Sequence, residues 1–168
     1  MTNSQIVLWT CLYFVALLAT VYFTRATARR VAGALAGGAV VGLAMLAMVR
    51  WGNAIGWWHV PFGSSRYFLP LFYLGSLISC SPIYLVTWRV ARRFGSRGLA
   101  VSVAITAIIG PPRDYLIAAT FPKWMVFGPG IAPIIADSAA YVVIVALGHG
   151  VMRLVAGPSC DDGLARRT

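Results

Sequence analysis

Residues 31–49 read VAGALAGGAVVGLAMLAMV, without a charged side chain, and Arg30 and Arg50 stand directly before and after them. About 20 apolar residues, at a rise of 1.5 Å per residue, cross the hydrocarbon core of a bilayer as one α-helix. A helix satisfies its backbone hydrogen-bonding groups within its own segment, as a lipid environment demands. This stretch therefore predicts a transmembrane helix.

The composition of the whole chain also indicates a membrane protein. Of the 168 residues, 60% are hydrophobic and 11% are charged, and Glu is absent. Soluble domains carry roughly 25% charged residues, so these few charges cannot cover a water-exposed surface. The net charge of +10 does not indicate a nucleic-acid partner, because the basic residues stand in short clusters between apolar runs.

Four further apolar stretches are long enough to cross a bilayer. We therefore predict an all-α integral membrane protein, a five-transmembrane-helix bundle that forms one polytopic domain over residues 1–168. The predicted spans are Ile6–Thr24, Val31–Val49, Phe68–Trp88, Gly98–Ala119 and Ile131–Met152, with a short tail at 153–168. No Lys or Arg precedes the first span, which favours a retained helix over a cleaved signal peptide.

The basic residues predict the orientation of these helices, because cytoplasmic connectors carry an excess of Lys and Arg. Ten lie in the first and third connectors and the tail: Arg25, Arg29, Arg30, Arg89, Arg92, Arg93, Arg97, Arg153, Arg166 and Arg167. The opposite side holds three: Arg50, Arg66 and Lys123. We expect a multi-pass protein of the cytoplasmic (inner) membrane, with its N-terminus outside and its C-terminus in the cytoplasm.

The two connectors on the predicted outer side are rich in aromatic residues. They cover residues 51–62 and 121–127. Trp and Tyr favour the headgroup level of a membrane, so we expect both connectors to lie along the interface. They form either an aromatic belt or a cover over a ligand.

The first stretch also contains two pairs of glycines spaced four residues apart, Gly33 with Gly37 and Gly38 with Gly42. Such spacing lets two helix backbones approach closely in a membrane. We expect the neighbouring helix to belong to the same chain, because a five-helix bundle needs close contacts of its own. The alternative is a docking face for a homo-oligomer or for a partner in a membrane complex.

Ionisable residues within the spans are the main functional signal, because such groups are costly in a membrane and face the bundle interior with a partner. Counting residues from the outer ends of the last two spans places Asp114 and Asp137 at a similar depth, about 7–9 Å. Tyr141 shares a helix face with Asp137. We predict one outer-leaflet cluster, with two further residues at its margin: Arg113, Asp114, Asp137 and Tyr141, then Tyr115 and His59.

Two prolines precede this cluster in the fourth span. Pro111 and Pro112 remove two backbone donors, and their rings clash with the preceding turn. We therefore expect span four to be broken at Pro111-Pro112, with Asp114 capping the new helix start. Broken helices of this kind build binding sites in transporters.

The cluster allows two roles. In the structural one, Arg113 pairs with Asp137 and locks spans four and five together, while Asp114 caps the helix. In the functional one, the cluster binds a ligand, relays a proton or takes part in catalysis. The two roles are compatible with each other.

Our leading hypothesis is a protein that binds or transports an apolar or amphipathic small molecule through this cluster. One rival is an intramembrane enzyme acting on a lipid or isoprenoid, with Asp114 or Asp137 as general acid or base. Another is an accessory subunit of a membrane complex. The sequence contains no phosphate-binding loop, dinucleotide fingerprint, metal-ligand spacing or nucleophile elbow. We thus expect no cofactor and no metal, and we assign no catalytic residue.

Reporter fusions test the predicted orientation. Fusions after Arg30, Arg97 and Arg167 should report the cytoplasm, and fusions near Gly63 and Lys123 should report the outside, because the positive clusters stay in the cytoplasm. A cytoplasmic signal from the fusion at Gly63 would contradict the orientation and the shared depth of the two carboxylates.

Overall fold

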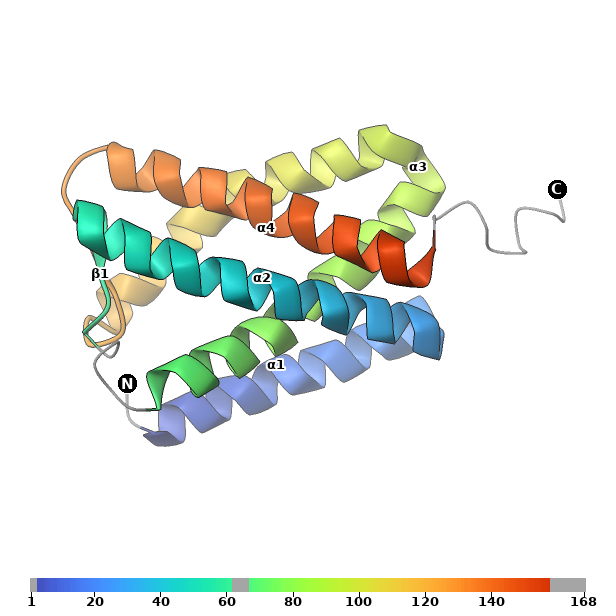
Figure 1. Cartoon of the computed structure of the whole chain (residues 1–168), viewed down its shortest axis with the longest axis horizontal. Coiled ribbons are helices and arrows are strands. Elements are labelled where there is room, and N and C mark those ends of the chain that lie inside the picture. Colours follow the sequence, from blue (N-terminus) through green and yellow to red (C-terminus); the bar gives the residue numbers. More distant parts are fainter. Residues whose placement is uncertain (1–2, 62–66, 158–168) are drawn as a thin grey trace, which may run out of the picture.

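The computed structural model describes residues 3–61 and 67–157, with side chains described from Val7 onward. These residues form four long helices and one small two-stranded sheet (Figure 1). The elements are α1 (Asn3–Thr24), α2 (Ala28–Ile55), β1 (Trp58–His59), α3 (Phe68–Thr120), β2 (Val126–Phe127) and α4 (Ala132–Ala156). All four helices are long and apolar enough to cross a membrane, which confirms the prediction of a helical membrane protein at this level.

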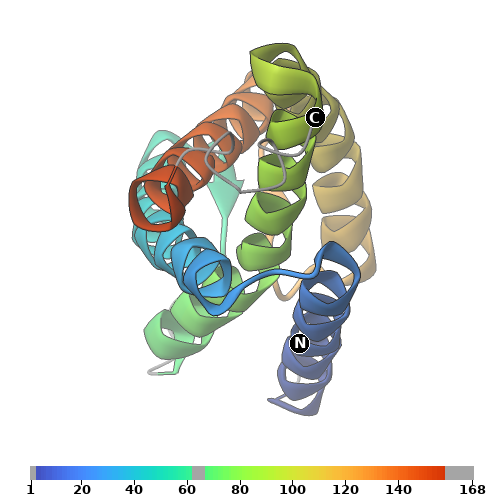
Figure 2. The same ribbon diagram turned by 90° about the vertical axis from the view of Figure 1, so that its right-hand side faces the viewer.

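Helix α3 reverses direction at Gly95. With 53 residues, a straight α3 would measure about 80 Å, more than twice the hydrocarbon thickness of a bilayer. Gly95 has φ 64° and ψ −153°, a conformation that glycine reaches without a steric penalty. Figures 1 and 2 show the two halves of α3 running back past each other. They cover the predicted spans at 68–88 and 98–119.

The predicted break at Pro111-Pro112 is wrong. Helix α3 continues through both prolines, and Gly95 is its one residue with non-helical backbone angles. Proline fixes φ near the helical value, so a helix passes through it when packing compensates for the lost hydrogen bond. Here Gly110 and Pro111 are buried, and Gly110 lies directly against the ring of Tyr141 in α4. No new helix start exists at Asp114, so Asp114 is not a cap.

Helix α2 packs against α3 and α4 through its glycines. A Cβ on Gly37 would lie 2.5 Å from the carbonyl oxygen of Gly148 in α4, and one on Gly38 would lie 2.5 Å from the carbonyl oxygen of Leu77 in α3. The other two members, Gly33 and Gly42, face α4 and α3 in the same way. Both pairs thus serve contacts within the chain, and docking a partner on this face would require the bundle to open.

Helix α1 lies at the edge of the bundle. It packs mainly on α3, and most of its large apolar side chains are exposed. Figure 2 shows it well away from α4. Its exposed apolar surface fits a helix surrounded by lipid on most sides.

The two ends of the bundle differ in the residues that join their segments. At one end, Trp58 pairs with Phe127 and His59 with Val126, so β1 and β2 join the two aromatic connectors in an antiparallel sheet. Helix α1 begins at this end, and α4 finishes at the opposite one (Figure 1).

Arginines join the segments at the opposite end. Arg29 Nε donates to the carbonyl of Val155 at 2.9 Å, and Arg89 Nη1 donates to that of Thr24 at 2.9 Å. The first contact places the first connector beside the end of α4, and the second joins α3 to the end of α1. Four residues used in the orientation argument lie outside the described residues: Gly63, Arg66, Arg166 and Arg167.

Alanine substitutions test the close approach of α2 to α4. Gly37→Ala places a methyl group against the backbone of Gly148, so we expect a loss of about 1–3 kcal/mol in the free energy of unfolding. Gly150→Ala is the matched control, because a Cβ there meets nothing within 4 Å and alanine favours helix by about 1 kcal/mol. Thermal unfolding in detergent measures both, and equal stability of the two variants would contradict this contact.

Candidate functional site

Three of the predicted residues form a closed hydrogen-bonded ring. Arg113 Nε and Nη2 donate to Asp114 Oδ1 at 2.9 and 2.7 Å. Arg113 Nη2 also donates to the Tyr141 hydroxyl at 2.6 Å, and that hydroxyl donates to Asp114 Oδ2 at 2.7 Å. Each charged group in this ring thus has both an opposite charge and a neutral partner, which suits a low-dielectric site.

Close packing of α3 and α4 positions this ring. The Tyr141 side chain lies flat against α3 at Gly110, where a Cβ would overlap the aromatic ring. The Arg113 guanidinium sits 5.6 Å from the centroid of the same ring. Glycine at 110 is therefore what brings the hydroxyl of α4 within reach of the charged pair on α3.

Asp137 does not pair with Arg113, contrary to the structural role considered above. Arg113 instead forms its salt bridge with its neighbour in sequence, Asp114. Asp114 is free for this pairing because it does not cap a helix. Asp137 is 8% exposed, and its Oδ2 has no hydrogen-bond partner among the described residues. Asp137 lies within electrostatic range of Asp114 and Arg113. It therefore belongs to the cluster, although it is not part of the hydrogen-bonded ring.

Tyr115 also lies in the cluster and also has an unmet polar atom. Its hydroxyl is buried, finds no partner in the described part of the chain, and lies within electrostatic range of Asp137. Its ring stacks on Phe127 of β2, with centroids 4.0 Å apart and planes 10° from parallel. The aromatic connector thus covers the cluster through this stacked pair.

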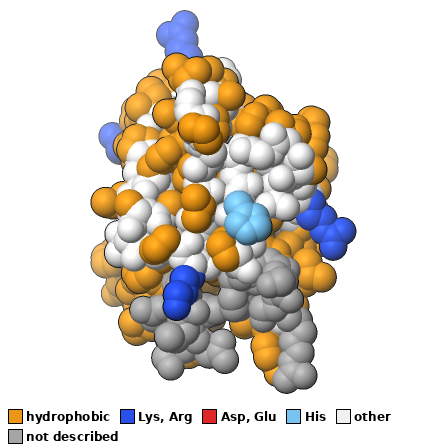
Figure 3. Space-filling model, turned by 90° about the vertical axis from the view of Figure 1, so that its left-hand side faces the viewer, with side chains coloured by type: hydrophobic (Ala, Val, Ile, Leu, Met, Phe, Trp, Pro, Cys, Tyr) orange, Lys and Arg blue, Asp and Glu red, His pale blue; other side chains and the backbone are white. Residues whose placement is uncertain are grey.

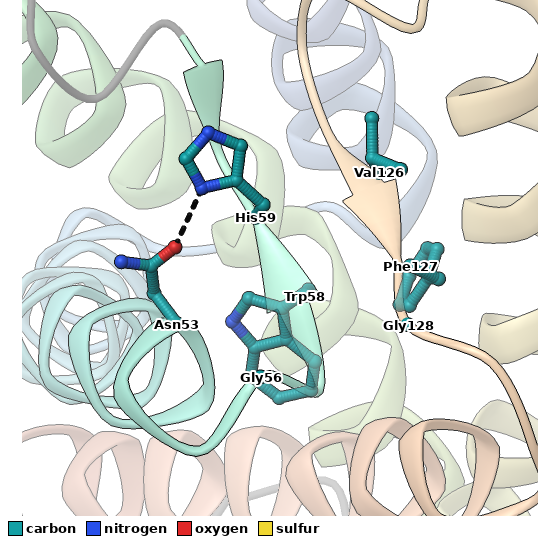
Figure 4. A pocket seen from close by; sticks show the side chains of 7 residues that line it. All are labelled: Asn53, Gly56, Trp58, His59, Val126, Phe127 and Gly128. Atoms are coloured by element: carbon teal, nitrogen blue, oxygen red, sulfur yellow. Dashed lines mark hydrogen bonds between the residues drawn. The ribbon is translucent and has the colours of Figure 1, made fainter.

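His59 lies apart from the ring, in the sheet at the end of the bundle. Its Nδ1 is 2.9 Å from Asn53 Oδ1, and it points away from Trp58, which turns into the core (Figure 4). A cavity of about 310 Å³ lies here, lined by Asn53, Gly56, Trp58, His59, Val126, Phe127 and Gly128. Phe127 lines this cavity and stacks on Tyr115, so it contacts both the cavity and the cluster.

Figure 3 shows the surface of this end. It is mainly hydrophobic and uncharged, with scattered Lys and Arg side chains and no acidic side chain in view. The carboxylates of the cluster are therefore not displayed on this surface.

Two residues of the site were missed by sequence reasoning. Phe127 was assigned only to an aromatic connector, and Gly110, which precedes the two prolines, was given no role. The glycine immediately before a proline pair was the one available signal, since small residues mark close helix contacts.

Comparisons with protein-family models, curated proteins and solved structures find no match to this chain. The chemistry of the site thus follows from its own geometry. The ring is satisfied internally, whereas Asp137 Oδ2 and the Tyr115 hydroxyl are buried and have no hydrogen-bond partner among the described residues. Such a pair can hold a group that donates hydrogen bonds.

Removing single groups tests the ring. Tyr141→Phe deletes the hydroxyl that bridges Arg113 and Asp114, and we expect a loss of about 1–3 kcal/mol in the free energy of unfolding. Asp114→Asn should also destabilise, and the double variant should lose less than the sum because one network is involved. Tyr22→Phe is the control, since Tyr22 is exposed on α1. Additive losses in detergent unfolding would contradict a shared network.

Proposed function

We propose that this protein binds or transports an amphipathic small molecule in the cytoplasmic membrane. The polar end of the molecule lies at Asp137 and Tyr115, and its apolar part lies along the lipid-facing surface of α3 and α4. The observation that carries the proposal is the buried Asp137 oxygen, for which the described part of the chain supplies no partner. A polar group left unmet in a membrane costs several kcal/mol, so its retention argues for a ligand.

The position of the cluster at the edge of the bundle supports the proposal. The Arg113 side chain beside it is 52% exposed, so the cluster borders the outer surface of the bundle. Ile109 and Leu116 lie one turn before and one turn after Arg113 on α3, and both are exposed. An apolar tail placed against these side chains leaves the polar end within reach of Asp137.

We further propose that the chain crosses the membrane five times, with its N-terminus outside. The reversal at Gly95 supports two crossings by α3, and the other three helices add one each. Segregation of charge supports the orientation. The arginine contacts gather at the end where α4 finishes, whereas the paired aromatic strands lie at the end where α1 begins. Under this topology the cluster lies in the outer leaflet.

Native mass spectrometry of the gently purified protein tests the proposed binding. We expect a bound amphipathic molecule on the natural protein, and its loss from Asp137→Asn and Tyr115→Phe, because each removes one unmet group. Tyr22→Phe should retain the molecule.

Other outcomes would favour the two rival functions. Chemical conversion of an added lipid that is abolished in Asp137→Asn would favour an enzyme. Asp137 is the carboxylate to change in this experiment, because both oxygens of Asp114 accept hydrogen bonds in the ring. A larger assembly without a bound molecule would favour an accessory subunit. Either result without ligand binding would overturn the proposal.

A further inference from the structure

We infer that the polar end of the bound molecule is a protonated amine, so that the ligand is an amphipathic alkylamine. This inference rests on the proposed function. It arises from the charges and hydrogen-bonding groups that the cluster leaves unmatched: Asp137 Oδ2 and the Tyr115 hydroxyl.

Charge gives the first step. Arg113 and Asp114 neutralise one another in the ring, and Tyr141 is neutral. Asp137 is the further carboxylate in the same neighbourhood, so the cluster has an excess of one negative charge when Asp137 is ionised. A buried carboxylate is stable in a membrane when a positive group pairs with it. A ligand with an anionic head would add repulsion at this point.

Hydrogen bonding gives the second step. An ammonium group carries three donors and no acceptor. One donor can meet Asp137 Oδ2 and another the oxygen of the Tyr115 hydroxyl. An alcohol can also contact both groups, since it donates one hydrogen bond and accepts others, but it leaves the charge of Asp137 unpaired. The stacked rings of Tyr115 and Phe127 add aromatic faces, to which cations are attracted.

The described residues do not favour a metal ion as the positive group. Among them, no set of three His, Cys, Asp or Glu side chains is grouped as metal ligands would be. The aromatic and aliphatic surroundings fit a cation attached to an apolar chain.

Binding of three amphiphiles with the same chain tests the charge. Dodecylamine, dodecanol and dodecanoate are titrated into the full-length protein in neutral-detergent micelles near pH 7, with isothermal calorimetry as the readout. We expect dodecylamine to bind about tenfold or more tightly than dodecanol, because charge-assisted hydrogen bonds are roughly twice as strong as neutral ones. The net charge of +10 would by itself favour dodecanoate, so preference for the amine cannot come from overall charge.

Variants locate the preference. Asp137→Asn should abolish the advantage of the amine over the alcohol, because the charge is removed while the shape is kept. Tyr115→Phe should weaken amine binding several-fold, and Tyr22→Phe should change nothing. If Asp137→Asn does not fold, Tyr115→Phe still tests the inference, since its ring and its stacking on Phe127 are preserved.

The outcomes separate this inference from the proposed function. Dodecanol or dodecanoate binding as tightly as dodecylamine, with loss of binding in Asp137→Asn, would overturn the amine and leave the binding site standing. If Asp137 is neutral because it is protonated, the protein should show no preference for dodecylamine over dodecanol. That result would also overturn the inference. Insensitivity of all three amphiphiles to both Asp137 and Tyr115 would overturn the site together with the amine.

Discussion

The close contact of α2 with α3 and α4 is the constraint on which the rest of this bundle depends. Lipid tails are as apolar as leucine, so helices in a membrane associate through van der Waals packing rather than through burial from water. Gly37 and Gly38 let α2 approach the carbonyls of Gly148 and Leu77 on two different helices. This contact fixes the first half of α3 and α4 around α2. The second half of α3 then meets α4 at Gly110, where the ring of Tyr141 enters.

The sequence predicted the helices and the depth of the site in the membrane, because both follow from counting residues along a helix. Apolar runs of membrane length identify the helices, and a fixed rise per residue predicts which residues share a depth. Arg113, Asp114 and Tyr141 do meet, as predicted from the depth of the first two and from the helix face that Tyr141 shares with Asp137. The glycine pairs also lie between helices of the same chain, as expected.

The same reasoning could not predict which side chains contact each other at a given depth, because this depends on how each helix is rotated about its axis. Arg113 and Asp137 were expected to pair from a shared depth, yet the nearest carboxylate to Arg113 is its own neighbour in sequence. The proline pair was expected to break the helix, but packing against Tyr141 holds the chain helical there. His59 was predicted to lie at the margin of the cluster. In the structure it pairs with Val126 in the sheet at the end of the bundle, apart from the ring.

The surroundings of an unmet buried atom decide whether a ligand can meet it, as a comparison of Asp137 with His149 shows. Thr87 donates its hydroxyl hydrogen to the carbonyl of Tyr84, so His149 Nδ1 must donate to Thr87, and Nε2 is left as an acceptor without a partner in the described residues. His149 is 2% exposed and lies among fully buried side chains, away from the surface of the bundle. Asp137 is nearly as buried, but it borders the half-exposed Arg113 at the surface of the bundle. The unmet oxygen of Asp137 therefore lies near the edge of the bundle, which a membrane-borne molecule contacts first, whereas His149 lies inside it.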